Sequence, residues 1–193
     1  DTKDSIRTID TSGKNLLKLI NEILDISKIE AGKAELNITG FDLNELIDNL
    51  SSMFELRCQQ KQLHWNVKGT SGRISVHGDE SKLRQILVNL LGNAIKFTES
   101  GEVSFSITAL EENQYRFDII DTGNGIPVEV QDKIFEPFQQ DEEGSKKGGT
   151  GLGLAISKKY LELMGADLIL KSKLNEGAHF YFTLTLPPAD EIS

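Results

Sequence analysis

The amino-acid sequence predicts an α+β fold. A mixed, mostly antiparallel β-sheet carries helices on one face as a two-layer α/β sandwich, preceded by one long N-terminal helix. Segments with helical periodicity dominate the first half of the chain, and alternating strands joined by tight turns dominate the second. At 193 residues the chain can bury one sizeable core, so one domain with an appendage accounts for its length.

The first thirty or so residues form the predicted long helix. Isoleucine and leucine recur from Ile6 to Ile29 at spacings of three, four and seven, and Ala31-Gly32 ends the pattern. Such an apolar stripe needs a covering partner, which a helical hairpin or a coiled-coil dimer usually supplies. We therefore divide the chain into an appendage at residues 1–33, a main domain at 34–188 and a tail at 189–193.

Local signals define the elements that follow the appendage. Asp42 and Glu45 have capping-box spacing at the start of one helix, and Asp79 is placed to cap another. A turn at 69–72 separates two alternating segments. The expected elements are a strand at 35–39, a helix at 42–60, strands at 63–67 and 74–77, and a helix at 79–97.

The second half of the chain is richer in strands. Pro127 suits the first turn of a short helix, and Gly165 suits the end of a longer one. Residues 136–150 lack periodicity and predict a mobile loop. The expected elements are strands at 103–110 and 115–120, helices at 127–135 and 152–164, and strands at 168–172 and 179–186.

The composition excludes several classes of function. With 30 acidic and 21 basic residues, the net charge of −9 disfavours non-specific binding to nucleic acid or to an anionic membrane. Cys58 is the single cysteine, which excludes an internal disulfide and favours a reducing compartment. No apolar run approaches the ~18 residues of a membrane span, and no signal peptide is recognisable. We expect a soluble, cytoplasmic module without membrane contact, which a membrane-anchored sensor can also contain.

One face of the predicted helix at 79–97 is chemically unusual. At about 100° per residue, Gln85, Asn89, Asn93 and Lys96 fall within roughly an 80° arc, and leucines gather on the opposite side. Asparagine is a poor interior helix former because its amide competes for nearby backbone groups. Two asparagines one turn apart therefore indicate a functional face.

Two further motifs are suited to a nucleotide. Residues 121–125 (Asp-Thr-Gly-Asn-Gly) end a strand, so Asp121 can accept a hydrogen bond from the amino group of adenine, although the motif taken alone favours a plain Asx turn. Residues 148–153 (Gly-Gly-Thr-Gly-Leu-Gly) run into a helix whose N–H groups can bind phosphate, although a hinge is the alternative. Neither the P-loop nor the dinucleotide-binding fingerprint fits these glycines.

The motifs, in their order along the chain, resemble the ATP-binding domain of sensor histidine kinases of two-component systems, within the GHKL group that shares the Bergerat fold. The resemblance covers residues 34–186, and residues 12–32 look like the second helix of the dimerisation and phosphoacceptor hairpin. The matching segments are the N box at 89–98, the first glycine box at 121–125, the F box at 135–138 and the second glycine box at 149–154.

This resemblance implies ATP and Mg²⁺ as cofactors, with Asn89 and Lys96 as catalytic residues. Asn89 is the implied magnesium ligand, and Lys146 and Lys147 belong to a lid over the triphosphate. Phe135 and Phe138 are expected to pack the base of that lid. The implied nucleotide-binding residues are Asn93, Asp121, Gly123, Gly125, Ile126, Lys146, Lys147, Gly149, Thr150, Gly151, Leu152 and Gly153.

The implied reaction is transfer of the γ-phosphoryl group of ATP to a histidine. The family's acceptor histidine has no counterpart here, since His64, His77 and His179 occupy structural or exposed positions. We expect a kinase fragment that begins inside the hairpin, and the alternative is a natural protein that has lost its acceptor. The implied partners are the acceptor-histidine helix of the same or a partner subunit, a response regulator receiver domain, and a second copy in a homodimer.

Two glutamines depart from related patterns. Related ATPases of the gyrase and chaperone type carry a water-activating glutamate where this chain has Gln85, and an amide is no general base near neutral pH. Gln140 stands where many histidine kinases have an arginine. Three alternatives stay open: a GHKL ATPase or clamp, a noncatalytic regulatory module that docks a partner, and a protein serine kinase of the same fold.

Overall fold

The computed structural model describes residues 2–69, 72–139 and 149–189. Its main sheet has five strands in the order β2-β4-β5-β7-β6, in which β2 and β4 are parallel and the other neighbours antiparallel. The strands are β2 (His64–Lys68), β4 (Glu102–Ala109), β5 (Gln114–Asp121), β6 (Ile169–Ser172) and β7 (Ala178–Thr185). The predicted fold class is confirmed.

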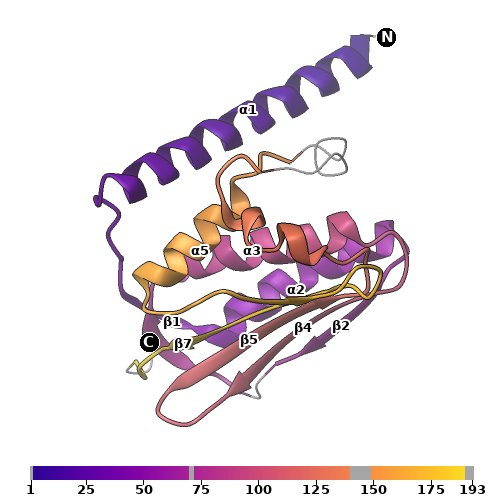
Figure 1. Cartoon of the computed structure of the whole chain (residues 1–193). Coiled ribbons are helices and arrows are strands. Elements are labelled where there is room, and N and C mark those ends of the chain that lie inside the picture. Colours follow the sequence, from indigo (N-terminus) through magenta and orange to yellow (C-terminus); the bar gives the residue numbers. More distant parts are fainter. Residues whose placement is uncertain (1, 70–71, 140–148, 190–193) are drawn as a thin grey trace.

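Three helices cover one face of this sheet (Figure 1): α2 (Leu43–Gln60), α3 (Glu80–Phe97) and α5 (Gly153–Leu163). The covered face is apolar because alternate residues of each strand point toward the helices. Phe105, Phe117 and Phe182 are at most 1% exposed, and the rings of Phe117 and Phe182 stack with centroids 4.8 Å apart. Cys58 of α2 belongs to the same core, and burial raises the pKa of its thiol.

Both predicted helix caps are present. Asp42 accepts hydrogen bonds from the backbone N–H groups of Asn44 and Glu45, and Asp79 accepts one from the N–H of Lys82 at 3.0 Å. Burial favours the protonated form of Asp79, but hydrogen bonds from Lys82 and Asn37 outweigh it and lower the pKa of this carboxyl. Asp79 thus fixes the start of α3 and ties the preceding segment to it.

Two predicted elements are wrong in position or type. The strand expected at 35–39 begins later, as β1 (Thr39–Asp42), and it pairs antiparallel with β3 (Ser75–Gly78). The residues before Thr39 are not part of the strand because the N–H of Asn37 donates to the side chain of Asp79. The helix expected at 127–135 consists of two separate 3₁₀ turns, Val128–Val130 and Lys133–Phe135. Gln131 ties this segment to β6 by donating to the carbonyl of Ser172, a tertiary contact that local periodicity does not report.

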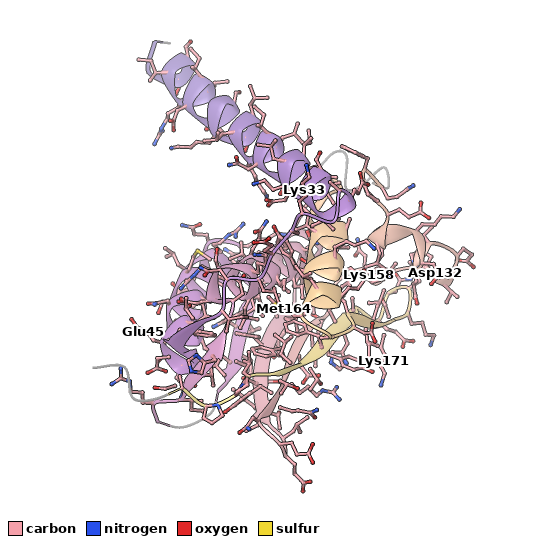
Figure 2. All side chains as sticks on the ribbon, turned by 90° about the vertical axis from the view of Figure 1, so that its left-hand side faces the viewer. Lys33, Glu45, Asp132, Lys158, Met164 and Lys171 are labelled. Atoms are coloured by element: carbon pink, nitrogen blue, oxygen red, sulfur yellow. The ribbon has the colours of Figure 1, made fainter. Side chains whose placement is uncertain are left out.

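The long N-terminal helix, α1 (Thr2–Glu30), is present as predicted, and Gly32 follows it with a φ of +65°. Figure 2 shows α1 projecting away from the sandwich, with its C-terminal end over α5. Ile26 is buried there, whereas Ile6 and Ile9 are 61% and 71% exposed. No helix in the described part of the chain is long and apolar enough to cross a membrane.

Candidate functional site

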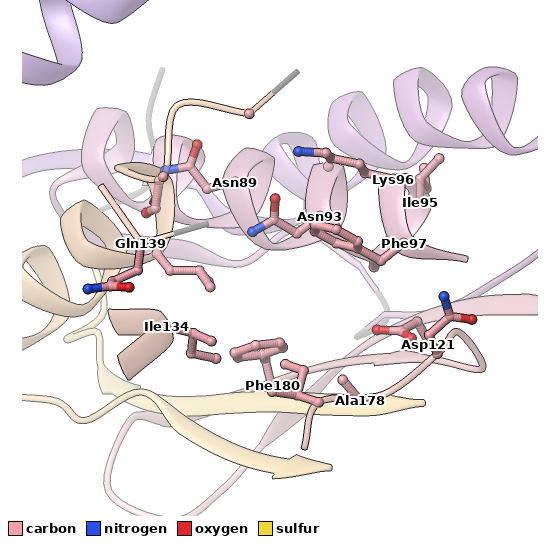
Figure 3. Close-up of a pocket in the computed structure, with 18 of the residues that line it drawn as sticks. Asn89, Asn93, Ile95, Lys96, Phe97, Asp121, Ile134, Gln139, Ala178 and Phe180 are labelled. Atoms are coloured by element: carbon pink, nitrogen blue, oxygen red, sulfur yellow. Dashed lines mark hydrogen bonds between the residues drawn. The ribbon is translucent and has the colours of Figure 1, made fainter. Parts of the chain in front are cut away.

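A cavity of about 980 Å³ lies between α3 and the sheet. Figure 3 shows Asn89, Asn93 and Lys96 of α3 on one side, with Asp121, Ala178 and Phe180 of the strands on the other. The loop after β5 and the glycine-rich segment before α5 also line it. Its volume is at the upper end of the usual range for small-molecule and cofactor sites.

The polar face of α3 divides between this cavity and α1. Asn89 Nδ2 donates to the carbonyl of Gly153 and to Ser157 Oγ, both at 3.2 Å, so α5 holds the amide nitrogen. A β-carbon at Gly153 would stand 3.4 Å from the Asn89 amide carbon, an ordinary van der Waals contact, so α5 packs directly against Asn89. Gln85, by contrast, donates to Asp25 of α1 at 3.2 Å and does not line the cavity.

Cations gather where α3 ends. Lys96 lines the cavity, and its ammonium lies 4.9 Å from the centre of the Phe97 ring. Lys61, which follows α2 as its C-cap, donates to the carbonyls of Ile95 and Lys96 at 2.6 and 3.1 Å, where it satisfies acceptors that a helix C-terminus leaves open. Lys61 and Lys96 thus bring positive charge to this end of the cavity, which Glu99 also lines, in a chain of net charge −9.

Asp121 ends β5 on the opposite wall and is 8% exposed. Burial raises the pKa of its carboxyl, although hydrogen bonds from the backbone N–H groups of Gly123 and Ala178 oppose the shift. The bond from Gly123 measures 2.8 Å. A β-carbon at Gly123 would stand 2.5 Å from the carbonyl oxygen of Phe97, so glycine is required there. Gly123 does not line the cavity; it holds Asp121 in place.

The loop after Asp121 is anchored to β6. Gly125 has a φ of +67° and passes so close to the carbonyl of Lys173 that no side chain fits. The N–H of Ile126 donates to Ser172 Oγ at 2.8 Å, and Gln131 Nε2 donates to the carbonyl of Ile126 at the same distance. These contacts hold Gly125 and Ile126 in the cavity wall.

The glycine-rich segment reaches the cavity through its backbone. Gly149, Thr150, Gly151 and Gly153 line it, whereas Leu152 is fully buried and does not. Gly151 adopts a φ of +73° and its carbonyl accepts a 2.9 Å hydrogen bond from the N–H of Phe138, which joins the two motifs. The predicted lid residues Lys146 and Lys147, and Gln140, lie outside the described residues.

The predicted packing residues behave differently from each other. Phe135 is partly buried and meets Phe180 edge to face, with ring centroids 6.4 Å apart, whereas Phe138 is 63% exposed. None of the three histidines lines the cavity: His64 and His77 are exposed, and His179 bonds to Asp118 at 2.7 Å.

Sequence reasoning missed two parts of the wall. An apolar patch of Ile134, Ala178 and Phe180 lies beside Asp121, but on the sequence these residues read as ordinary core positions. Lys18 and Glu22 of α1 also line the cavity. Only the packing of α1 onto the domain brings them there, so no local signal reports them.

A polar helix wall facing an apolar patch and a buried carboxylate, in a sandwich with this strand order, defines a nucleotide-binding domain of the GHKL class. Residues 78–189 match the model of the family described as Histidine kinase-, DNA gyrase B-, and HSP90-like ATPase, and the chain belongs to that family. Within it, the chain is an ATP-binding domain of the sensor histidine kinase type.

Relatives of the chain carry histidine kinase names. It is 38% identical over 95% of its length to the signal transduction histidine-protein kinase BarA of Escherichia coli, and 35% identical over 96% to the sensory/regulatory protein RpfC of Xanthomonas campestris. The chain spans 21% of BarA and 27% of RpfC. It therefore corresponds to between about a fifth and just over a quarter of such a protein.

Solved structures agree with this assignment. Full-length ShkA in complex with AMPPNP superposes with a TM-score of 0.83 and 32% identity, covering 97% of this chain and 39% of that one. The histidine kinase ThkA in complex with the response regulator TrrA gives a TM-score of 0.70 and 26% identity, covering 95% of this chain and 51% of that one.

Proposed function

We propose that the cavity binds Mg-ATP and that the chain serves as the catalytic part of a histidine kinase, which transfers the γ-phosphoryl group to a histidine on another helix. The observation that carries the proposal is the opposition of Asp121 and the amides of Asn89 and Asn93 across one cavity. Asp121 accepts a hydrogen bond from the adenine amino group, and Ile134 and Phe180 contact the base.

The α3 wall suits a metal-bound triphosphate. Asn89 holds Mg²⁺ through Oδ1, since its nitrogen is already bonded to α5. When bound, the metal neutralises negative charge that develops on the transferring phosphates. Asn93 and Lys96 donate to phosphate oxygens, and the backbone N–H groups around Gly149, Thr150 and Gly151 add donors near the N-terminus of α5. Lys146 and Lys147, which lie outside the described residues, are the further proposed contacts of the triphosphate.

Transfer is favoured over hydrolysis by the residue at position 85. Gln85 is an amide, its nitrogen is bonded to Asp25, and it does not line the cavity, so it does not deprotonate a water beside the γ-phosphate. The γ-phosphoryl group is therefore retained for an acceptor side chain. This feature favours the kinase over a GHKL ATPase or clamp.

The exposed stripe of α1 supports the proposed partners. Leu16 and Leu17 are 58% and 60% exposed, which suits packing against a hairpin helix that carries the acceptor histidine, within a homodimer. The complex of ThkA with TrrA supports a response regulator as the next partner of such a kinase. We place this activity in the cytoplasm, where ATP is supplied and a single thiol stays reduced.

The test has two stages. Isothermal calorimetry with Mg-ATP and Mg-GTP measures binding, and ATP should bind at least tenfold tighter because guanine presents a carbonyl where adenine presents a donor. A hairpin fragment with the acceptor histidine is then added, and acid-labile phosphate on that fragment is measured. Binding without transfer would favour a noncatalytic regulatory module, and sustained phosphate release without an acceptor would favour an ATPase.

A further inference from the structure

Glu22 is a buried carboxylate on a helix that belongs to no part of the sandwich. It is 5% exposed, and its Oε2 is the only buried side-chain nitrogen or oxygen in the described part of the chain that lacks a hydrogen-bond partner. The other buried carboxylates, Asp79, Asp118 and Asp121, all accept hydrogen bonds. A buried charge without a partner is unfavourable, so this oxygen marks a place for a ligand.

Glu22 lies on the side of the cavity where Asn89 is the proposed magnesium ligand. Asp25 of α1 is bonded to Gln85 of α3. Glu22 stands about one turn from Asp25 on α1, and Asn89 stands about one turn from Gln85 on α3. Glu22 and Asn89 line the same cavity. The contact between the two helices therefore presents a carboxylate from α1 and an amide from α3 to one space.

The neighbouring cation does not satisfy this carboxylate. Lys18 Nζ is 3.6 Å from Glu22 Oε1, and its side chain is 65% exposed, so the ion pair is long and screened by water. Oε2 receives nothing from it. The negative charge of the Glu22 carboxylate would repel the phosphates of ATP unless a cation lies between them.

We propose that Glu22 is a second protein ligand, with Asn89, for the cation that accompanies ATP. Mg²⁺ is usually held by one or two carboxylates together with substrate phosphates, and the two oxygens offered here fit that pattern. The inference rests on the proposed binding of Mg-ATP and extends it, because α1 then contributes to the nucleotide site. By reciprocity, cation and nucleotide binding strengthen the packing of α1 on the domain.

Calorimetry on three proteins tests the proposal: the unaltered chain, Glu22→Gln, and the matched control Glu30→Gln, which removes an exposed carboxylate from the same helix. Each is titrated with ATP in excess Mg²⁺ and again in EDTA. Glu22→Gln should weaken binding about tenfold to a hundredfold in Mg²⁺ and leave it unchanged or stronger in EDTA. Glu30→Gln should match the unaltered chain in both buffers.

A second readout follows the cation itself. Mn²⁺ replaces Mg²⁺, and the electron paramagnetic resonance signal of free Mn²⁺ measures its affinity for the ATP-loaded chain. Glu22→Gln should lose about tenfold in that affinity. Circular dichroism melting shows whether the isosteric variant keeps its fold.

The possible failures are distinguishable. If the unaltered chain binds ATP with a magnesium dependence that Glu22→Gln retains in full, Glu22 is not a ligand, and the proposed function stands. Tighter binding of Mg-ATP by Glu22→Gln would also overturn the inference, because Glu22 would then repel the phosphates. Absence of magnesium-dependent ATP binding by the unaltered chain would refute the proposed function as well.

Discussion

α1 and α3 are both long helices with an apolar stripe and a polar face, yet the chain uses them in opposite ways. In α3 the apolar stripe is closed within the core, where Leu83, Ile86 and Leu87 are at most 1% exposed, and the polar face lines a cavity. In α1 most of the stripe is open, and Asp25 near its C-terminal end attaches it to the domain through hydrogen bonds with Gln85 and Tyr160. A periodic apolar pattern thus predicts a helix, but it does not indicate which part of the molecule covers the apolar side chains.

The largest expected effect tests this difference in burial. Leu87→Ala in α3 should lower the free energy of unfolding by about 2–5 kcal/mol, because it opens a cavity in a packed core. The matched change Leu16→Ala in α1 should cost less than about 0.5 kcal/mol, since Leu16 is 58% exposed. Urea denaturation measures both. A comparable loss in the two variants would mean that the stripe of α1 is covered in solution.

The polar faces are compared by removing one lysine from each helix. Lys96→Ala should weaken ATP binding about tenfold to a hundredfold, because it removes charge-assisted hydrogen bonds worth about 1.5–3 kcal/mol each. Lys14→Ala removes an exposed lysine of α1 that pairs with Asp10 at 2.6 Å, so it should leave affinity unchanged. Calorimetry in Mg²⁺ measures the affinity of both variants for ATP. Equal affinities would show that Lys96 does not contact the bound nucleotide.

Asp121 extends the comparison to the wall opposite α3. Asp121→Asn should weaken ATP binding about tenfold and reduce the preference over GTP.

Burial raises the pKa of Asp121, so the folded state holds this proton more tightly than the unfolded chain does. Its contribution to stability therefore falls as pH rises from the unfolded pKa through the folded pKa.

The Asp121→Asn variant has no titrating carboxyl at this position. Its melting temperature should exceed that of the unaltered chain at pH 7 and approach it at acidic pH, which calorimetric melting curves measure. A variant that is less stable at pH 7 would show that the hydrogen bonds from Gly123 and Ala178 matter more than the buried charge.

The smallest effect concerns the attachment of α1. Asp25 accepts from Gln85 at 3.2 Å and is hydrogen-bonded to Tyr160. Asp25→Ala should cost about 0.5–1.5 kcal/mol of local stability and speed amide exchange in the C-terminal half of α1. Exchange in α3 should not change. Asp10→Ala, at an exposed position of α1, is the control, and faster exchange in both would point to loss of helix propensity alone.

The same variant reports through a tyrosine. Burial raises the pKa of Tyr160 above its ordinary value, and the charge and hydrogen bond of Asp25 raise it further. Asp25→Ala should therefore lower the pKa of Tyr160, which ultraviolet absorbance titration detects. An unchanged pKa would mean that burial and the charge of Asp79 account for the shift.

The fold was predictable where signals are local. Strand alternation around turns placed β4, β5 and β7 to within one or two residues, and the side chains of Asp42 and Asp79 identified the starts of α2 and α3. The segment after Pro127 was not predictable, since Gln131 bonds to the distant Ser172 and holds it in separate 3₁₀ turns. Competition between local and distant hydrogen bonds determines the secondary structure of such segments.

The candidate site divides in the same way. The sequence by itself determined the polar stripe of α3, because a helix of 3.6 residues per turn brings Asn89, Asn93 and Lys96 to one side whatever surrounds it. It also determined Asp121 at a strand end and the glycines that allow close backbone approach. Tertiary structure alone decided that Gln85 turns to α1, that Phe180 faces the cavity, and that Glu22 enters its wall. Those outcomes depend on which surfaces pack together, and periodicity within one element carries no information about its neighbour.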